Sequence, residues 1–305
     1  MYLKVIRFGF FGNFFIGLLA IALNIEATLS LGVPFNSLAY YILIFCAPVA
    51  YYNYAYMGAI KYSTSSNPRS DWFIKHKKFI KISQSILTAV SIFLIAYLFL
   101  TNISSILNLP IYYWLAVLLM FAVAAMYYGL LPTRYFNLNL RNTGWLKPLI
   151  VGFMWACTAN ILPIMMLKIT SNVMADNTTL WVWLFIKNWM FCTVNAIIFD
   201  IKDYEIDANR ELKTFVVRIG IHKTIAFILI PLLAVGMCSL LVFGYIQSLA
   251  PIQIEMNLIP FVLTIIVAFL MYTKKNILFY LIVIDGLILV KALCGISAVL
   301  LLRYY

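Results

Sequence analysis

The sequence predicts an all-α integral membrane protein, and three observations support this fold class. The chain of 305 residues is 65% hydrophobic and only 10% charged, with a mean hydropathy of +0.98. Apolar stretches of about 20 residues, the length that crosses a bilayer as a helix, recur along the whole chain. The basic residues lie mostly in alternate connections between these stretches. A soluble domain could not bury so much apolar surface, and a disordered chain needs the opposite composition, so both classes are excluded.

The apolar stretches predict nine transmembrane helices in one bundle, forming a single domain over residues 1–305. The first stretch follows the N-terminus without a small-residue cleavage site, and we therefore expect a retained span instead of a signal peptide. Five cysteines lie inside apolar stretches without metal-ligand spacing and are interpreted as small buried hydrophobic residues. The expected spans are 8–30, 37–60, 82–100, 110–131, 148–168, 180–199, 223–247, 256–273 and 277–302.

The formal net charge of +12 is explained by membrane topology and not by a nucleic-acid partner. If the N-terminus is cytoplasmic, 18 of the 22 basic residues fall on the inner side. The positive-inside rule then predicts a multi-pass protein with its N-terminus in the cytoplasm and its C-terminus outside. The connections 61–81, 132–147 and 200–222 are the long polar ones, and they lie on that inner side. We therefore expect any chemistry at the cytoplasmic face.

Acidic residues cluster in one place, directly after the sixth expected span. Asp200, Asp203 and Asp207 are spaced i, i+3, i+7, so a continuing helix would place them on one face, within about 60° of one another. Carboxylates on one face repel unless a cation neutralises them, and oxygen ligands suit Mg²⁺ bridged to phosphate. The alternative is a solvated loop whose acids pair with Lys202, Arg210 and Lys213. Spacing alone leaves both readings open.

Two segments of the chain resemble the UbiA family of intramembrane prenyltransferases. The first is Phe199-Asp200-Ile-Lys-Asp203-Tyr-Glu-Ile-Asp207, continued by Leu212-Lys213-Thr214 and Arg218-Ile219-Gly220, which is similar to the family's second aspartate-rich motif. The second runs from Tyr127-Tyr128 through Pro132, Arg134, Leu140-Arg141 and Leu146-Lys147-Pro148 to Gly152 and Trp155, and resembles the segment after the family's fourth helix. The nine-helix layout also matches, so the resemblance covers essentially the whole chain.

The family's first motif, N-D-x-x-D-x-x-x-D, is represented only by Asn53. The sequence is most similar to a bacterial branch in which Tyr52-Asn53 and the downstream Arg69 and Trp72 stand in place of that motif. This branch implies a bacterial inner membrane and a chamber that opens to the cytoplasmic side, bounded by the ends of the second and sixth helices.

The resemblance implies Mg²⁺-dependent transfer of an isoprenyl group from a prenyl diphosphate to a lipophilic or aromatic acceptor within the membrane. Asp200, Asp203 and Asp207 would hold the metal, and Asp203 and Asn53 would be the catalytic residues. The residues expected to bind substrate are Arg69, Tyr128, Arg134, Arg141, Lys147, Asn195 and Lys213. The missing first motif favours an alternative of another class, a non-catalytic UbiA-like protein that binds or moves a prenyl lipid.

Several polar residues fall at membrane depth, where they are costly and therefore suggest function. Asn188 and Asn195, seven residues apart, share a face that we expect to look into the bundle. Asp285 is interpreted as the partner of Lys291 or Lys187 in a structural ion pair between helices. Asn13, Asn24 and Glu26 are expected to line an internal cavity or its outer rim.

Overall fold

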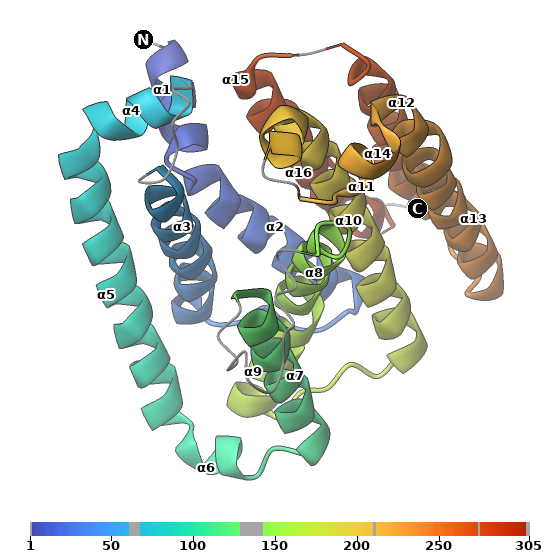
Figure 1. Ribbon diagram of the computed structural model, residues 1–305. Coiled ribbons are helices and arrows are strands. Elements are labelled where there is room, and N and C mark those ends of the chain that lie inside the picture. The colour runs from blue at the N-terminus through green and yellow to red at the C-terminus, as the bar shows by residue number, and fades with distance from the viewer. Residues whose placement is uncertain (1, 61–67, 129–142, 210–211, 274, 303–305) are drawn as a thin grey trace.

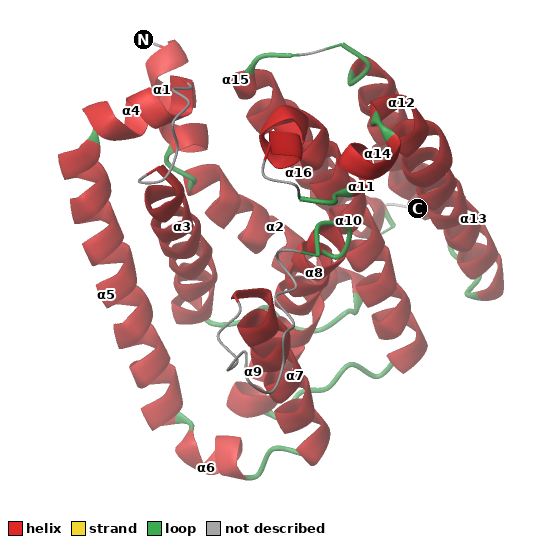
Figure 2. Ribbon diagram, viewed as in Figure 1, coloured by secondary structure: helices red, strands yellow, loops and turns green. Residues whose placement is uncertain are grey.

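The structure is a computed structural model that describes residues 2–60, 68–128, 143–209, 212–273 and 275–302. Within these ranges every regular element is helical (Figure 2). The first half contains α1 (Tyr2–Phe11), α2 (Phe14–Ser30), α3 (Leu38–Ile60), α4 (Pro68–Lys75), α5 (Lys77–Thr101), α6 (Ile103–Leu107) and α7 (Ile111–Tyr128). Next come α8 (Lys147–Ala156), the π-helical turn η1 (Cys157–Ile161), α9 (Leu162–Ser171) and α10 (Thr178–Asn209).

The last third continues with α11 (Phe215–Ile219), α12 (Ile221–Thr224), the π-helical turn η2 (Ile225–Leu229), α13 (Ile230–Ile246) and α14 (Pro251–Leu270). It ends with α15 (Ile277–Phe279), a third π-helical turn, η3 (Tyr280–Ile284), and α16 (Asp285–Leu301). The prediction of an all-α fold is confirmed for the described residues.

The described residues contain seven helical segments that are long and apolar enough to cross a membrane. They coincide with seven of the expected spans and lie at 38–58, 77–101, 147–171, 178–204, 221–246, 251–270 and 277–301. The first expected span is instead a pair of helices, α1 and α2, bent by 67° at the break between them. The fourth corresponds to α7, an apolar helix that the structure describes as far as Tyr128. A multi-pass membrane protein is therefore supported.

The break between α1 and α2 has a local cause. Asn13 adopts a left-handed conformation with φ of 61°, which asparagine tolerates better than most residues. A Cβ on Gly12 would lie 2.7 Å from the carbonyl oxygen of Phe8, so the turn also needs a glycine there. The bend leaves the Asn13 side chain buried, with 3% exposure.

The helices form one bundle in which α10 occupies a central position (Figure 1). In this view α1, α4 and α15 lie at one end of the bundle, α6 lies at the other, and α5 runs between the two ends. Gly152 of α8 allows close packing against α10, because a Cβ there would lie 2.7 Å from the backbone nitrogen of Thr193. The largest apolar core joins α10 with η2, α13, α14 and α16.

A buried charged cluster links α2, α10 and α16. Glu26 accepts hydrogen bonds from Lys291 at 2.5 Å and from Lys187 at 3.4 Å. Lys291 also donates to Asn188, and Lys187 donates to Asn257 at 2.9 Å. The expectation that Asp285 pairs with Lys187 or Lys291 is therefore wrong, because Glu26 is the partner of both lysines.

Candidate functional site

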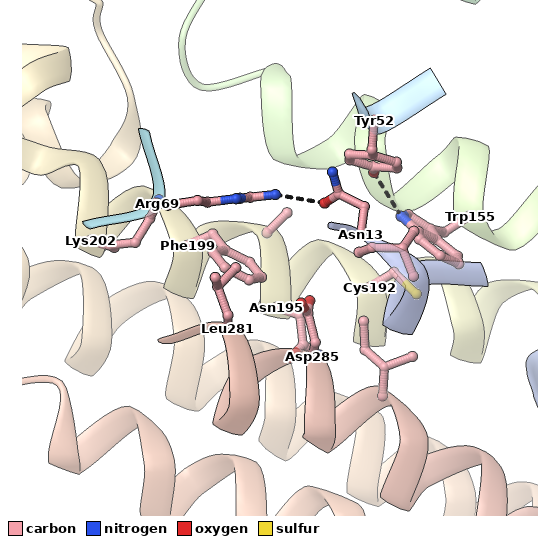
Figure 3. A pocket seen from close by; sticks show the side chains of 13 residues that line it. Asn13, Tyr52, Arg69, Trp155, Cys192, Asn195, Phe199, Lys202, Leu281 and Asp285 are labelled. Carbon is pink, nitrogen blue, oxygen red and sulfur yellow. Dashed lines mark hydrogen bonds between the residues drawn. The ribbon is translucent and has the colours of Figure 1, made fainter. Parts of the chain in front are cut away.

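A cavity of about 200 Å³ lies among the inner faces of the helices around α10. Its walls come from parts of the chain that are far apart in sequence (Figure 3). The polar and charged groups that line it are Asn13, Arg69, Asn195, Lys202 and Asp285, and the aromatic ones are Tyr52, Trp155 and Phe199. Cys192 and Ala196 of α10 also line the wall, together with the aliphatic residues Ile16, Leu281 and Ile288. The cavity thus combines charged, polar and apolar surface in a small volume.

Arg69 reaches the cavity from α4 and is held there by Asn13. Its Nη2 donates to Asn13 Oδ1 at 2.6 Å, as Figure 3 shows, and its guanidinium lies 4.2 Å from the centre of the Tyr56 ring. Burial lowers the pKa of the Arg69 guanidinium from its ordinary value, while the nearby Asp285 and Asp203 carboxylates act in the opposite direction. Because arginine ordinarily titrates above 12, Arg69 keeps its charge at neutral pH.

Asn53 contacts the side of Asn13 that faces away from the cavity. It is fully buried, and its Oδ1 accepts a hydrogen bond from Asn13 Nδ2 at 2.8 Å. Asn53 thus orients the amide of Asn13, which in turn receives Arg69, and it contributes no surface to the cavity itself. Its predicted catalytic role stays a prediction.

Tyr52 and Trp155 form the aromatic side of the cavity. Trp155 Nε1 donates to the Tyr52 hydroxyl at 3.3 Å, which ties α8 to α3 (Figure 3). Phe199 lies one helical turn before Lys202 on α10, and the Lys202 ammonium is 5.9 Å from the Phe199 ring centre. Rings of this kind can contact an unsaturated hydrocarbon chain and stabilise a carbon that gains positive charge.

The three aspartates predicted as metal ligands are held by two lysines. Lys147 Nζ lies 2.8 Å from Asp200 Oδ1 and 3.9 Å from Asp207 Oδ2, so its ammonium stands between these two buried carboxylates. Asp203 is partly exposed and pairs with Lys202 at 2.8 Å.

A Mg²⁺ ion held by these aspartates would need carboxylate oxygens that other cations do not already contact. An ion shared by Asp200 and Asp207 would take the position that the Lys147 ammonium fills, and Asp203 pairs with another cation. Within the described parts of the chain, no group of three or more His, Cys, Asp or Glu residues lies close enough to hold a metal. The three aspartates as arranged therefore do not fit a three-carboxylate Mg²⁺ site.

The other predicted substrate-binding residues have three different positions relative to the cavity. Asn195 is 1% exposed and lines the cavity, whereas Lys147 contacts the acidic segment and does not line the cavity. Lys213 is exposed and does not line the cavity. Arg134, Arg141 and the side chain of Tyr128 lie outside the described residues.

The structure adds Asp285, Lys202 and Asn13 to the candidate site. Intramembrane polar character singled out Asp285 and Asn13 in the sequence, but not their common cavity. In the sequence, Lys202 was predicted only as a charge partner of the neighbouring acidic residues. No further sequence signal distinguishes these three residues from the polar residues that belong to the Glu26 cluster.

Comparisons with protein-family models, with curated proteins and with solved structures find no match for this chain.

Proposed function

We propose that this protein is a UbiA-like enzyme that binds a prenyl diphosphate and transfers its isoprenyl group to a lipophilic or aromatic acceptor in the membrane. The observation that carries the proposal is the cavity in which Arg69 and Lys202 meet the aromatic rings of Tyr52, Trp155 and Phe199. A prenyl diphosphate has the matching chemistry, because an anionic head group adjoins an unsaturated hydrocarbon chain.

The proposal includes the membrane topology. The bent pair α1–α2 and the helix α7 would supply the first and fourth of nine spans. The N-terminus would be cytoplasmic and the C-terminus outside, in a bacterial inner membrane. The cavity would then be the inner part of a chamber open to the cytoplasmic side, because Arg69 and Lys202 lie next to connections that the positive-inside rule assigns to that side.

The size of the cavity limits what it can enclose. Small-molecule sites usually measure about 300–1,000 Å³, whereas this cavity measures about 200 Å³. The diphosphate and the first carbons of the chain would lie inside it, and the rest of the isoprenyl tail would lie between helices or in lipid.

Arg69 and Lys202 would stabilise charge that grows on the diphosphate as the allylic carbon–oxygen bond breaks. The guanidinium suits this role, since it presents several donors to phosphate oxygens in a fixed geometry. The apolar wall around them would exclude water from the reacting carbon. Lys147 would hold Asp200 and Asp207, and the lysine would neutralise these buried carboxylates close to an anionic substrate.

The dependence on Mg²⁺ stays a prediction, and one experiment tests it together with the reaction. Purified protein in nanodiscs is incubated with geranylgeranyl diphosphate and candidate lipophilic or aromatic acceptors, with either Mg²⁺ or EDTA. Release of diphosphate together with an acceptor product supports the proposal. Absence of product under every condition contradicts it.

A non-catalytic protein that binds or moves a prenyl lipid is the second candidate. The Lys147 ammonium between Asp200 and Asp207 favours it, because the lysine occupies the place where a catalytic metal would sit. Binding of geranylgeranyl diphosphate without any release of diphosphate would support this candidate over the enzyme.

A further inference from the structure

Asp285 is a buried carboxylate on the wall of the cavity. It is 6% exposed and begins α16, directly after the π-helical turn η3. π-Helical turns inside helices occur often at functional sites, because they shift the side chains that follow. In Figure 3 the Asp285 side chain points into the cavity from below, on the same side as Asn195.

Among the described residues, neither the Asp285 carboxylate nor the Asn195 amide oxygen receives a hydrogen bond. Asp285 accepts no hydrogen bond and forms no ion pair with any residue that the structure describes. Asn195 donates to the Phe191 carbonyl at 2.9 Å, and its Oδ1 has no partner within the described chain. Two hydrogen-bond acceptors therefore face the cavity without a donor.

The two cations of the cavity do not donate a hydrogen bond to Asp285 or Asn195. Arg69 donates to Asn13 at 2.6 Å, and Lys202 pairs with Asp203 at 2.8 Å. Both cations attract the Asp285 carboxylate, but neither forms an ion pair with it. Lys291, less than two helical turns along α16, is taken by Glu26.

Glu26 and Asp285 differ in the partners of their carboxylates. Both are acidic groups buried in the same bundle, and a buried carboxylate is costly unless it is paired and hydrogen-bonded. Within the described residues, two lysines contact Glu26 and none contacts Asp285. A carboxylate that is left open inside a cavity points to a ligand that supplies the donor.

We propose that Asp285 and Asn195 bind a hydroxyl group of the acceptor, an inference that rests on the proposed function. Both side chains offer acceptor atoms to the cavity, so this side selects an O–H donor and repels the diphosphate. Arg69 and Lys202 offer donors and select the diphosphate. The cavity thus has two chemically opposite sides, which fix the orientation of two substrates relative to each other.

Two probes that differ only in the donor test this inference. One is 4-octylphenol, and the other is 4-octylanisole, in which a methyl ether replaces the hydroxyl. Each is titrated into wild-type protein in nanodiscs, and the rise of the unfolding temperature gives its apparent affinity. We expect the phenol to bind about tenfold more tightly than the anisole, as charge-assisted hydrogen bonds are the stronger class.

Two variants of Asp285 distinguish a role in ligand binding from a role in stability. Asp285→Leu should abolish the preference for the phenol, and Asp285→Asn, which keeps a neutral acceptor, should retain part of it. Without ligand, Asp285→Leu should unfold at the wild-type temperature or above, because it removes a buried carboxylate that has no close partner. Equal affinity for the two probes in wild type, or a lower unfolding temperature for both variants, overturns the inference.

Neither probe carries a phosphate, so failure of this test can be distinguished from failure of prenyl diphosphate binding. A phenol preference without binding of prenyl diphosphate would leave the hydroxyl site standing and contradict the transferase. Binding of prenyl diphosphate without a phenol preference would support the proposed function and contradict the hydroxyl site.

Discussion

Removal of the Glu26 charge should strongly destabilise the fold. Glu26 is 1% exposed and is the acceptor that Lys187 and Lys291 share, at 3.4 Å and 2.5 Å. Glu26→Gln keeps the size of the side chain and one acceptor oxygen, but it removes the carboxylate that both buried ammonium groups contact. Breaking a buried pair by removing one partner costs about 3–5 kcal/mol. Because glutamine still accepts one hydrogen bond, we expect the lower end of this range.

The assay is equilibrium unfolding with SDS in mixed micelles, followed by tryptophan fluorescence, which gives the change in free energy of unfolding. Glu255→Gln is the matched control, because Glu255 is exposed on α14 and should change stability by no more than about 0.5 kcal/mol. A Glu26→Gln variant as stable as the control would refute the reasoning that this carboxylate neutralises both lysines.

Three further predictions concern packing and the acidic segment. Gly152→Ala should lower the free energy of unfolding by about 1–3 kcal/mol, since its methyl would meet the Thr193 backbone; SDS unfolding equal to wild type would contradict this. Lys147→Met should also destabilise the protein in that assay, by about 1–3 kcal/mol, because Asp200 loses its hydrogen-bond partner; an unchanged midpoint would count against the ion pair. Asp203→Ala should change the free energy of unfolding by no more than about 0.5 kcal/mol in that assay, because the partly exposed Asp203 pairs with Lys202 near the surface; a larger loss of stability would contradict this.

The positions of the spans were predictable because hydropathy depends on local composition alone. Seven described segments coincide with expected spans, and their ends differ by a few residues where helices such as α5 and α10 continue beyond the apolar stretch. The bend at Asn13 was not predicted, since a left-handed residue in an apolar run leaves no change in composition.

The partners of the buried polar residues were less predictable. Helical spacing correctly indicated that Asn188 and Asn195 face the interior, because periodicity fixes the face of a helix. It could not indicate which other helix faces them. For that reason the sequence suggested Asp285 as the partner of the buried lysines, whereas the packing of α2 against α16 delivers Glu26 instead.

The central claim is that the cavity binds a prenyl diphosphate through Arg69, and direct binding tests it. The measurement is the affinity of radiolabelled geranylgeranyl diphosphate for wild type, Arg69→Gln and Arg7→Gln in nanodiscs, where Arg7 is an exposed control. A hydrogen bond to a charged group contributes about 1.5–3 kcal/mol, so Arg69→Gln should bind about 10- to 100-fold more weakly and Arg7→Gln should match wild type. Equal affinity of all three proteins, or no binding to wild type, would contradict the claim.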